Sequence, residues 1–144
     1  MNQQGNPDGA IKSGVYHAET RGIAVDVAPI FLNEQSSPDE DRFVWAYRIR
    51  IENRGPITVQ LRNRYWHITN ANGAVQEVRG SGVVGKQPVL QPGEIFEYTS
   101  GAPLTTPSGI MVGHFEMVDD TGAKFEAAVP AFSLDSPHQA INLH

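Results

Sequence analysis

A short run with three glycines is the first candidate for chemistry in this sequence. Gly80-Ser81-Gly82-Val83-Val84-Gly85 fits G-x-G-x-x-G, the pattern of a dinucleotide-binding turn. Such a turn needs a strand before it and a helix after it, because the phosphate lies at the N-terminus of that helix. Pro88 and Pro92 exclude a helix after the run. We therefore expect an exposed bend between two strands, with at least one glycine at positive φ.

Basic residues beside this run leave a second interpretation open. Successive backbone N–H groups in a glycine loop can bind an anion without any helix. Eight of the 11 Lys and Arg residues lie between Arg42 and Lys86, and two of them flank the run. The candidate residues for binding a phosphate-containing small molecule, such as pyrophosphate or a nucleotide, are Arg79, Gly80, Gly82, Gly85 and Lys86.

The uneven charge has two possible meanings. Only Glu52 and Glu77 are acidic between Arg42 and Lys86, whereas the segments on both sides are acidic and the net charge is -5. Such a block can mark an interaction surface. Alternatively, strands from the three segments interleave in the sheets and leave a mixed surface. The overall acidity argues against general nucleic-acid binding, because that binding depends on neutralising phosphates.

His114 and Glu116 are weak candidates for metal ligands. They are two residues apart on an expected strand and therefore share a face, and Asp119 is close in the sequence. Metal sites use three or four converging ligands, so we expect an ordinary surface pair, no metal site and no cofactor. The chain has no cysteine, and neither Ser81 nor Ser100 lies in a G-x-S-x-G elbow. The sequence therefore predicts a binding module rather than an enzyme.

The segments that must position these residues have the pattern of short strands. One face of the segment 43–51 carries Phe43, Trp45, Tyr47, Ile49 and Ile51. This alternation predicts a strand whose apolar face meets a core. Asn72-Gly73 predicts a tight turn that joins 64–70 and 74–79 in a hairpin. About seven such strands predict an all-β fold, an antiparallel β-sandwich of fibronectin type III or immunoglobulin-like shape.

The length of 144 residues favours one domain. Residues 1–19 are expected to be a disordered tail, because their N-terminal part has few apolar side chains. Residues 20–137 are expected to form the domain, and residues 138–144 a flexible tail. No stretch reaches the ~18 apolar residues of a membrane span, and no secretory signal is visible. We therefore expect a cytoplasmic protein with no membrane partner.

Several short motifs surround and follow the long glycine-containing loop. They are Gln87-Pro88, Pro92-Gly93, Tyr98-Thr99-Ser100-Gly101 and Thr106-Pro107. With these motifs, residues 64–134 resemble the ApaG family. The segments TRGIAVDVAPIFLNEQSSP and WAYRIRIENRG resemble the N-terminal half of the same family, so the likeness covers 20–137. The resemblance implies a fibronectin type III-like sandwich in a small cytoplasmic bacterial protein.

The resemblance also bears on function. ApaG genes commonly lie near a gene for a diadenosine tetraphosphate hydrolase, and the family name is tied to cobalt and magnesium tolerance or efflux. Similar domains occur in eukaryotic F-box proteins and DNA polymerase delta-interacting proteins, where a protein-binding role is inferred. We therefore expect another protein as the partner, with a phosphate-type ligand of the glycine loop as the alternative. Family members often carry His and Asp where this chain has Tyr65 and Asn70, so a ligand role at those positions would not transfer.

Overall fold

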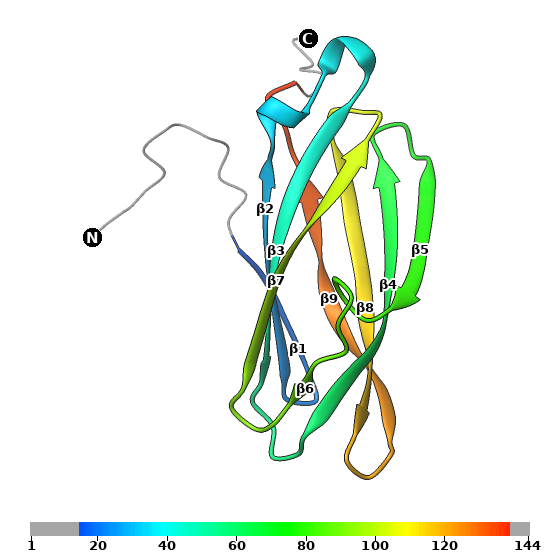
Figure 1. Ribbon diagram of the computed structural model, residues 1–144. Coiled ribbons are helices and arrows are strands. Elements are labelled where there is room, and N and C mark those ends of the chain that lie inside the picture. The colour runs from blue at the N-terminus through cyan, green and yellow to red at the C-terminus, as the bar shows by residue number, and fades with distance from the viewer. Residues whose placement is uncertain (1–14, 139–144) are drawn as a thin grey trace, which may run out of the picture.

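The computed structural model describes residues 15–138, which form two antiparallel sheets (Figure 1). The strands are β1 (Tyr16–Thr20), β2 (Ile23–Phe31), β3 (Phe43–Asn53), β4 (Val59–Asn70), β5 (Val75–Ser81), β6 (Val89–Leu90), β7 (Ile95–Leu104), β8 (Gly109–Asp119) and β9 (Lys124–Leu134). Two 3-10 helices, η1 (Asn33–Gln35) and η2 (Pro38–Glu40), connect β2 to β3. Within 15–138, no helix is long and apolar enough to cross a membrane.

The sheets pack face to face, which confirms the predicted sandwich. One sheet has the strand order β1-β2-β3-β7, and the other has the order β5-β4-β8-β9 with β6 beside β4. The predicted hairpin is also confirmed, because β4 pairs with β5 across a turn in which Gly73 has a φ of 86°. The fold is thus an all-β antiparallel sandwich of fibronectin type III or immunoglobulin-like shape.

The core lies between the sheets and contains the predicted face of β3. Its five side chains are at most 5% exposed, which confirms the predicted register. The indole of Trp66, from the opposite sheet, lies with its ring centroid 5.5 Å from that of Tyr47 and 6.1 Å from that of Phe132. Full burial of each such side chain contributes roughly 1.5–3 kcal/mol to folding. This aromatic cluster holds the sheets together.

The predicted boundary of the N-terminal tail is wrong. Residues 16–19, expected to be disordered, belong to β1 and pair with β2 from Tyr16 opposite Val27 onward. The tyrosine ring also lies 6.2 Å from the ring of Phe132 in β9. A neighbouring strand thus supplies the hydrogen bonds and the burial that this polar segment could not provide by itself.

The remaining tail predictions fall largely outside the structure. Residues 1–14 and 139–144 lie outside the described residues. His138, expected to begin the flexible C-terminal tail, instead packs its ring 5.7 Å from that of Phe31 and 6.0 Å from that of Phe43. The folded part therefore includes this histidine.

Arginine side chains on the four-stranded sheet are paired with acids from other segments of the sequence. Arg48 donates to Glu97 at 2.8 Å, and Arg54 donates to Glu19 at 3.2 Å. Arg50 lies 3.7 Å from Asp26. On this sheet, basic and acidic segments of the sequence therefore lie side by side. This agrees with the interpretation that the strands interleave the charged segments and leave a mixed surface.

The two sides of the sandwich differ. On one side, β9 contacts β1 and β2 across the sheets, and the N–H of Ala128 donates to the hydroxyl of Thr20 at 3.1 Å. On the other side, the edge strands are β5 and β7. Among the described residues, those of β4 are the only ones that pair with β5 (Figure 1). One long edge of the five-stranded sheet is therefore open.

Candidate functional site

The glycine run forms the end of β5 and a tight turn that leads toward β6. Val83 and Lys86 exchange two backbone hydrogen bonds of 2.8 and 2.9 Å. Gly82 and Gly85 have φ values of 65° and 79°, which confirms the predicted bend with positive φ. The expected exposure is correct at Ser81, Val84 and Gly85 but wrong at Gly82 and Val83, which are buried, and the valine joins the core.

The loop is fastened to β4 through backbone and side-chain contacts. The N–H of Gly82 donates to the carbonyl of Arg62 at 2.8 Å. The guanidinium of Arg64 donates to the carbonyls of Ser81 at 3.2 Å and Gly82 at 2.9 Å. It also lies so close to Gly80 that a Cβ there would come within 2.8 Å of Nη1. The absence of a side chain at Gly80 thus leaves space for the guanidinium of Arg64, which packs against the loop.

These contacts determine what the loop can offer an anion. The N–H groups of Gly82, Val83 and Lys86 already donate to backbone carbonyls, so they cannot form a nest of successive free donors. The guanidinium of Arg79 lies 4.4 Å from the ring centroid of Tyr65. An anion would therefore depend on the N–H groups of Val84 and Gly85 at the exposed tip and on side chains around the turn, and phosphate binding here stays a prediction.

The open edge of β5 presents backbone groups in a defined pattern. Hydrogen bonds at its two ends, from Gly82 to Arg62 and from Asn70 to Ala74, fix which groups face β4. Bonded residues alternate along an antiparallel strand, so the even-numbered residues of β5 face β4. The N–H groups that point to the open side belong to Val75, Glu77, Arg79 and Ser81.

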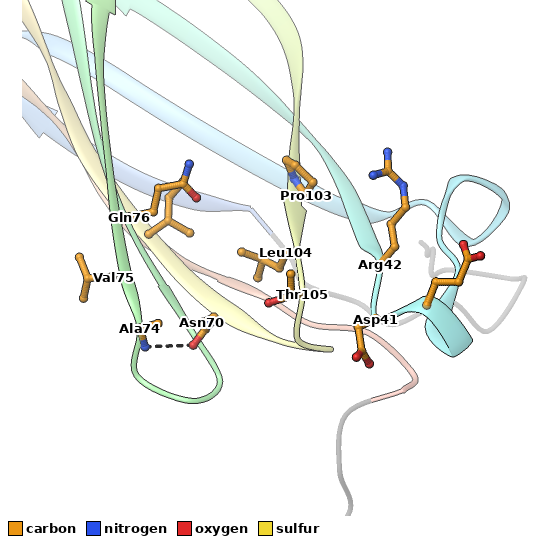
Figure 2. A pocket seen from close by; sticks show the side chains of 11 residues that line it. Asp41, Arg42, Asn70, Ala74, Val75, Gln76, Pro103, Leu104 and Thr105 are labelled. Atoms are coloured by element: carbon orange, nitrogen blue, oxygen red, sulfur yellow. Dashed lines mark hydrogen bonds between the residues drawn. The ribbon is translucent and has the colours of Figure 1, made fainter.

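A cleft of about 530 Å³ lies beside the first half of this edge (Figure 2). Its apolar lining comes from Ile68, Val75, Pro103 and Leu104. Ala74 also lines the cleft, and the polar lining residues are Glu40, Asp41, Arg42, Asn70, Gln76 and Thr105. These residues come from three distant segments of the chain, so no local sequence pattern could have indicated the cleft. Figure 2 shows Gln76 of β5 and Pro103 of β7 on different sides of it.

Asn70 holds the hairpin that forms one wall of the cleft. Its side-chain oxygen accepts the N–H groups of Asn72 at 2.9 Å and Ala74 at 3.0 Å. The hydroxyl of Thr106 accepts the N–H of Ala71 at 3.0 Å and ties the same turn to the end of β7. The wall is therefore braced by side chains on both sides of the turn.

The metal candidates lie on the outer face of the five-stranded sheet. His114 and Glu116 share a face of β8, as expected, and Glu126 of β9 joins them. Glu126 could not be identified as a candidate from the sequence alone, because its place beside β8 depends on strand register. Asp119 is engaged elsewhere, since its carboxylate accepts the N–H groups of Thr121 and Ala123 in the β8–β9 turn.

Stacked rings run across the same outer face. The ring of Tyr65 lies 5.1 Å from that of His114 at an interplanar angle of 28°. Its hydroxyl donates to the carboxylate of Glu77 at 2.5 Å. This hydrogen bond raises the pKa of Tyr65 above its ordinary value, so the phenol stays protonated. The stack Arg79–Tyr65–His114 thus links three strands.

Comparison with known proteins agrees with this fold. The family model described as the ApaG domain matches residues 33–119. The chain is 60% identical over 130 residues to Protein ApaG of Paramagnetospirillum magneticum, covering 90% of this chain and 100% of that protein. It is 64% identical over 124 residues to Protein ApaG of Rhodospirillum centenum, covering 86% and 95%. A crystal structure of an ApaA protein from Bordetella pertussis has a TM-score of 0.78 and 47% identity, covering 81% of this chain and 95% of that one.

Proposed function

Since the chain belongs to the ApaG domain family and folds as a β-sandwich, we propose that it is a cytoplasmic binding module that captures an extended segment of another protein. The segment would add as a strand to the open edge of β5. The observation that carries this proposal is that the open edge of β5 lies beside the cleft. Val75 belongs to β5 and also lines the cleft. Binding of this kind needs no catalytic group.

Backbone hydrogen bonds would supply the affinity. Exposed edges of sheets are templates for a further strand, because their N–H and C=O groups lack partners. Here the outward N–H groups of Val75, Glu77 and Arg79 are spaced to pair with every second residue of an added strand. The other sheet edge at the cleft is β7. It is less suited to pairing with an added strand, because Pro103 has no N–H to donate.

Side chains of the added strand would supply the specificity. Successive side chains of a strand point to opposite faces, so alternate ones would enter the cleft. Ile68 and Leu104 favour an apolar anchor there. Glu40 and Asp41 line the same cleft, with Arg42 as the single basic residue of its lining. The partner segment is therefore proposed to carry an apolar residue flanked by Lys or Arg.

We propose binding without turnover. The cleft that the described residues form is lined by neither His nor Cys, and the nucleophile–base pairs of hydrolases usually contain one of them. If the family has a role in cobalt or magnesium tolerance, we propose that the protein bound by this module carries it out.

The test uses displayed 12-residue peptides selected on the wild-type chain. Selected peptides are then synthesised, and their affinities are measured by fluorescence anisotropy against two matched variants. Glu77→Ala removes a side chain, whereas Glu77→Pro also removes an outward N–H. Losing one backbone hydrogen bond should weaken binding by about tenfold, so Glu77→Pro should bind about tenfold more weakly than Glu77→Ala.

A folded Glu77→Pro variant that binds as well as Glu77→Ala would contradict the proposal. Circular dichroism and urea unfolding establish that the variant is folded, which is expected because proline is tolerated at an edge whose N–H faces solvent. Failure to select any peptide with an apolar residue beside Lys or Arg would also contradict it.

A further inference from the structure

Three potential metal ligands converge on the outer face of β8 and β9. Glu116 lies directly opposite Glu126 in the strand pairing, and His114 lies two residues before Glu116. One ligand atom from each residue lies within 4.8 Å of the other two. The Nε2 atom of His114 is 3.5 Å from Oε2 of Glu126. Their separation fits ligands around one ion.

Among the described residues, the opposed carboxylates have no Lys or Arg partner, and the basic side chain that contacts Glu126 is that of His114. Like charges directly opposite on neighbouring strands destabilise the sheet. Among the residues that the structure describes, no Lys or Arg lies within 4.0 Å of either carboxylate, although Arg62 and Lys124 line the same depression. On the four-stranded sheet, by contrast, Glu97 lies 2.8 Å from an arginine nitrogen. A bound cation would supply the missing charge.

The surroundings hold two of the three ligands, His114 and Glu116, and leave room for water, whereas the side chain of Glu126 is 65% exposed. The imidazole of His114 is held by stacking on Tyr65, and only 21% of its side chain is exposed. The amide of Asn63 donates to Glu116 at 2.9 Å, and such contacts orient metal-binding carboxylates. Glu116 and Glu126 border a depression of about 430 Å³, large enough for water ligands.

We propose that His114, Glu116 and Glu126 form a binding site for a divalent transition-metal ion. Nε2 and one oxygen from each carboxylate are the protein ligands, and water completes the coordination. An imidazole with two carboxylates suits Zn²⁺, Ni²⁺ or Mn²⁺ better than Mg²⁺, which prefers oxygen ligands alone. This site lies on β8 and β9 and does not depend on peptide capture at β5.

The experiment uses the full chain without a purification tag. Zn²⁺ binding is measured by isothermal titration calorimetry, and Mn²⁺ is added to ¹⁵N-labelled protein to locate the ion by line broadening. The expected result is strongest broadening at the amides of 113–117 and 125–127. Glu126→Gln should weaken Zn²⁺ binding by at least about tenfold. The control Asp120→Asn removes one charge from the turn between the same strands and should change affinity by less than about twofold.

Other histidines are the main competitors, and the broadening separates them. His17 pairs with Asp26 on the opposite sheet, so an ion bound there would broaden β1 and β2 instead. That pattern would overturn the proposal, as would wild-type Zn²⁺ affinity in the Glu126→Gln variant. Glu77→Pro and Glu77→Ala both remove the carboxylate that Tyr65 contacts, so the two variants should have the same Zn²⁺ affinity. Failure of the metal site and failure of peptide capture are therefore distinguishable.

Discussion

The guanidinium of Arg64 donates to the carbonyl of Gly82 at 2.9 Å. This bond joins the inward side of β4 to the glycine loop and explains the run of small residues. Gly80 leaves space for the arginine, and Gly82 turns the chain so that its carbonyl meets it. The glycine run that resembled a phosphate-binding turn therefore has a structural role, which is to accommodate Arg64 and attach the loop to β4.

Gly82→Val should destabilise the chain by at least about 2 kcal/mol, because a β-branched residue tolerates positive φ poorly. Its Cβ would also collide with the carbonyl oxygen of Lys86. Urea unfolding measures the loss. Gly85→Val is the matched control, since its φ is also positive but no atom beyond the adjacent residues lies within 4 Å of the added Cβ. Equal losses for the two variants would contradict the steric explanation.

Val84→Asn should stabilise the chain by about 1 kcal/mol. Val84 has a φ of 44° and its side chain is exposed at the tip of the turn. Asparagine tolerates this conformation, whereas a β-branched residue is strained in it. Thermal unfolding of the two proteins provides the comparison, and an unchanged or lower melting temperature would show that the valine is not strained.

Tyr98→Phe should raise stability by about 1 kcal/mol, because a buried hydroxyl without a partner carries a desolvation penalty. The hydroxyl of Tyr98 has no hydrogen-bond partner among the described residues, and burial raises its pKa. Tyr65→Phe serves as the control, since that hydroxyl donates to Glu77 and its removal should not stabilise. Lower stability of Tyr98→Phe would indicate that the hydroxyl is satisfied by water.

Asp119→Asn should destabilise the chain at pH 7 and lose this effect in acid. Hydrogen bonds from Thr121 and Ala123 hold the pKa of Asp119 below its ordinary value. Because the pKa of Asp119 is lower in the folded chain, its ionised carboxylate stabilises the folded state. This stabilisation is complete at pH values above the unfolded-state pKa of ~3.9, and it is lost as the pH falls through the folded-state pKa. Urea midpoints from pH 7 to pH 2 should therefore converge for the two proteins.

Asp120→Asn is the control for that series. It removes one charge from the same turn but none of the hydrogen bonds to Asp119. Its effect at pH 7 should be smaller than that of Asp119→Asn. A constant gap between Asp119→Asn and the wild type at every pH would rule out linkage to the carboxylate.

The strands were predictable where local pattern and burial agree. Alternation from Phe43 to Ile51 specified the register of β3, and Asn72-Gly73 specified the β4–β5 hairpin. β1 was not predictable, because its polar residues are ordered by pairing with β2 rather than by their own composition. Tertiary pairing overrides weak local preference in such segments.

The candidate sites depend on strand order, which no local pattern encodes. Residues 40–42, 68–76 and 103–105 meet in the cleft only after the two sheets pack. Glu126 comes beside His114 only through the pairing of β8 with β9. The glycine run was visible at once, yet the role of Arg64 in closing it required the position of β4 relative to the loop.

Amide hydrogen exchange with and without a selected peptide tests strand addition most directly. With strand addition, the outward N–H groups of Val75, Glu77 and Arg79 should exchange quickly in the free chain and slow at least about tenfold at saturating peptide. The N–H of Val78 faces β4 and should already be protected in the free chain. Slowing at another strand, with those three amides unchanged, would contradict capture on the edge of β5.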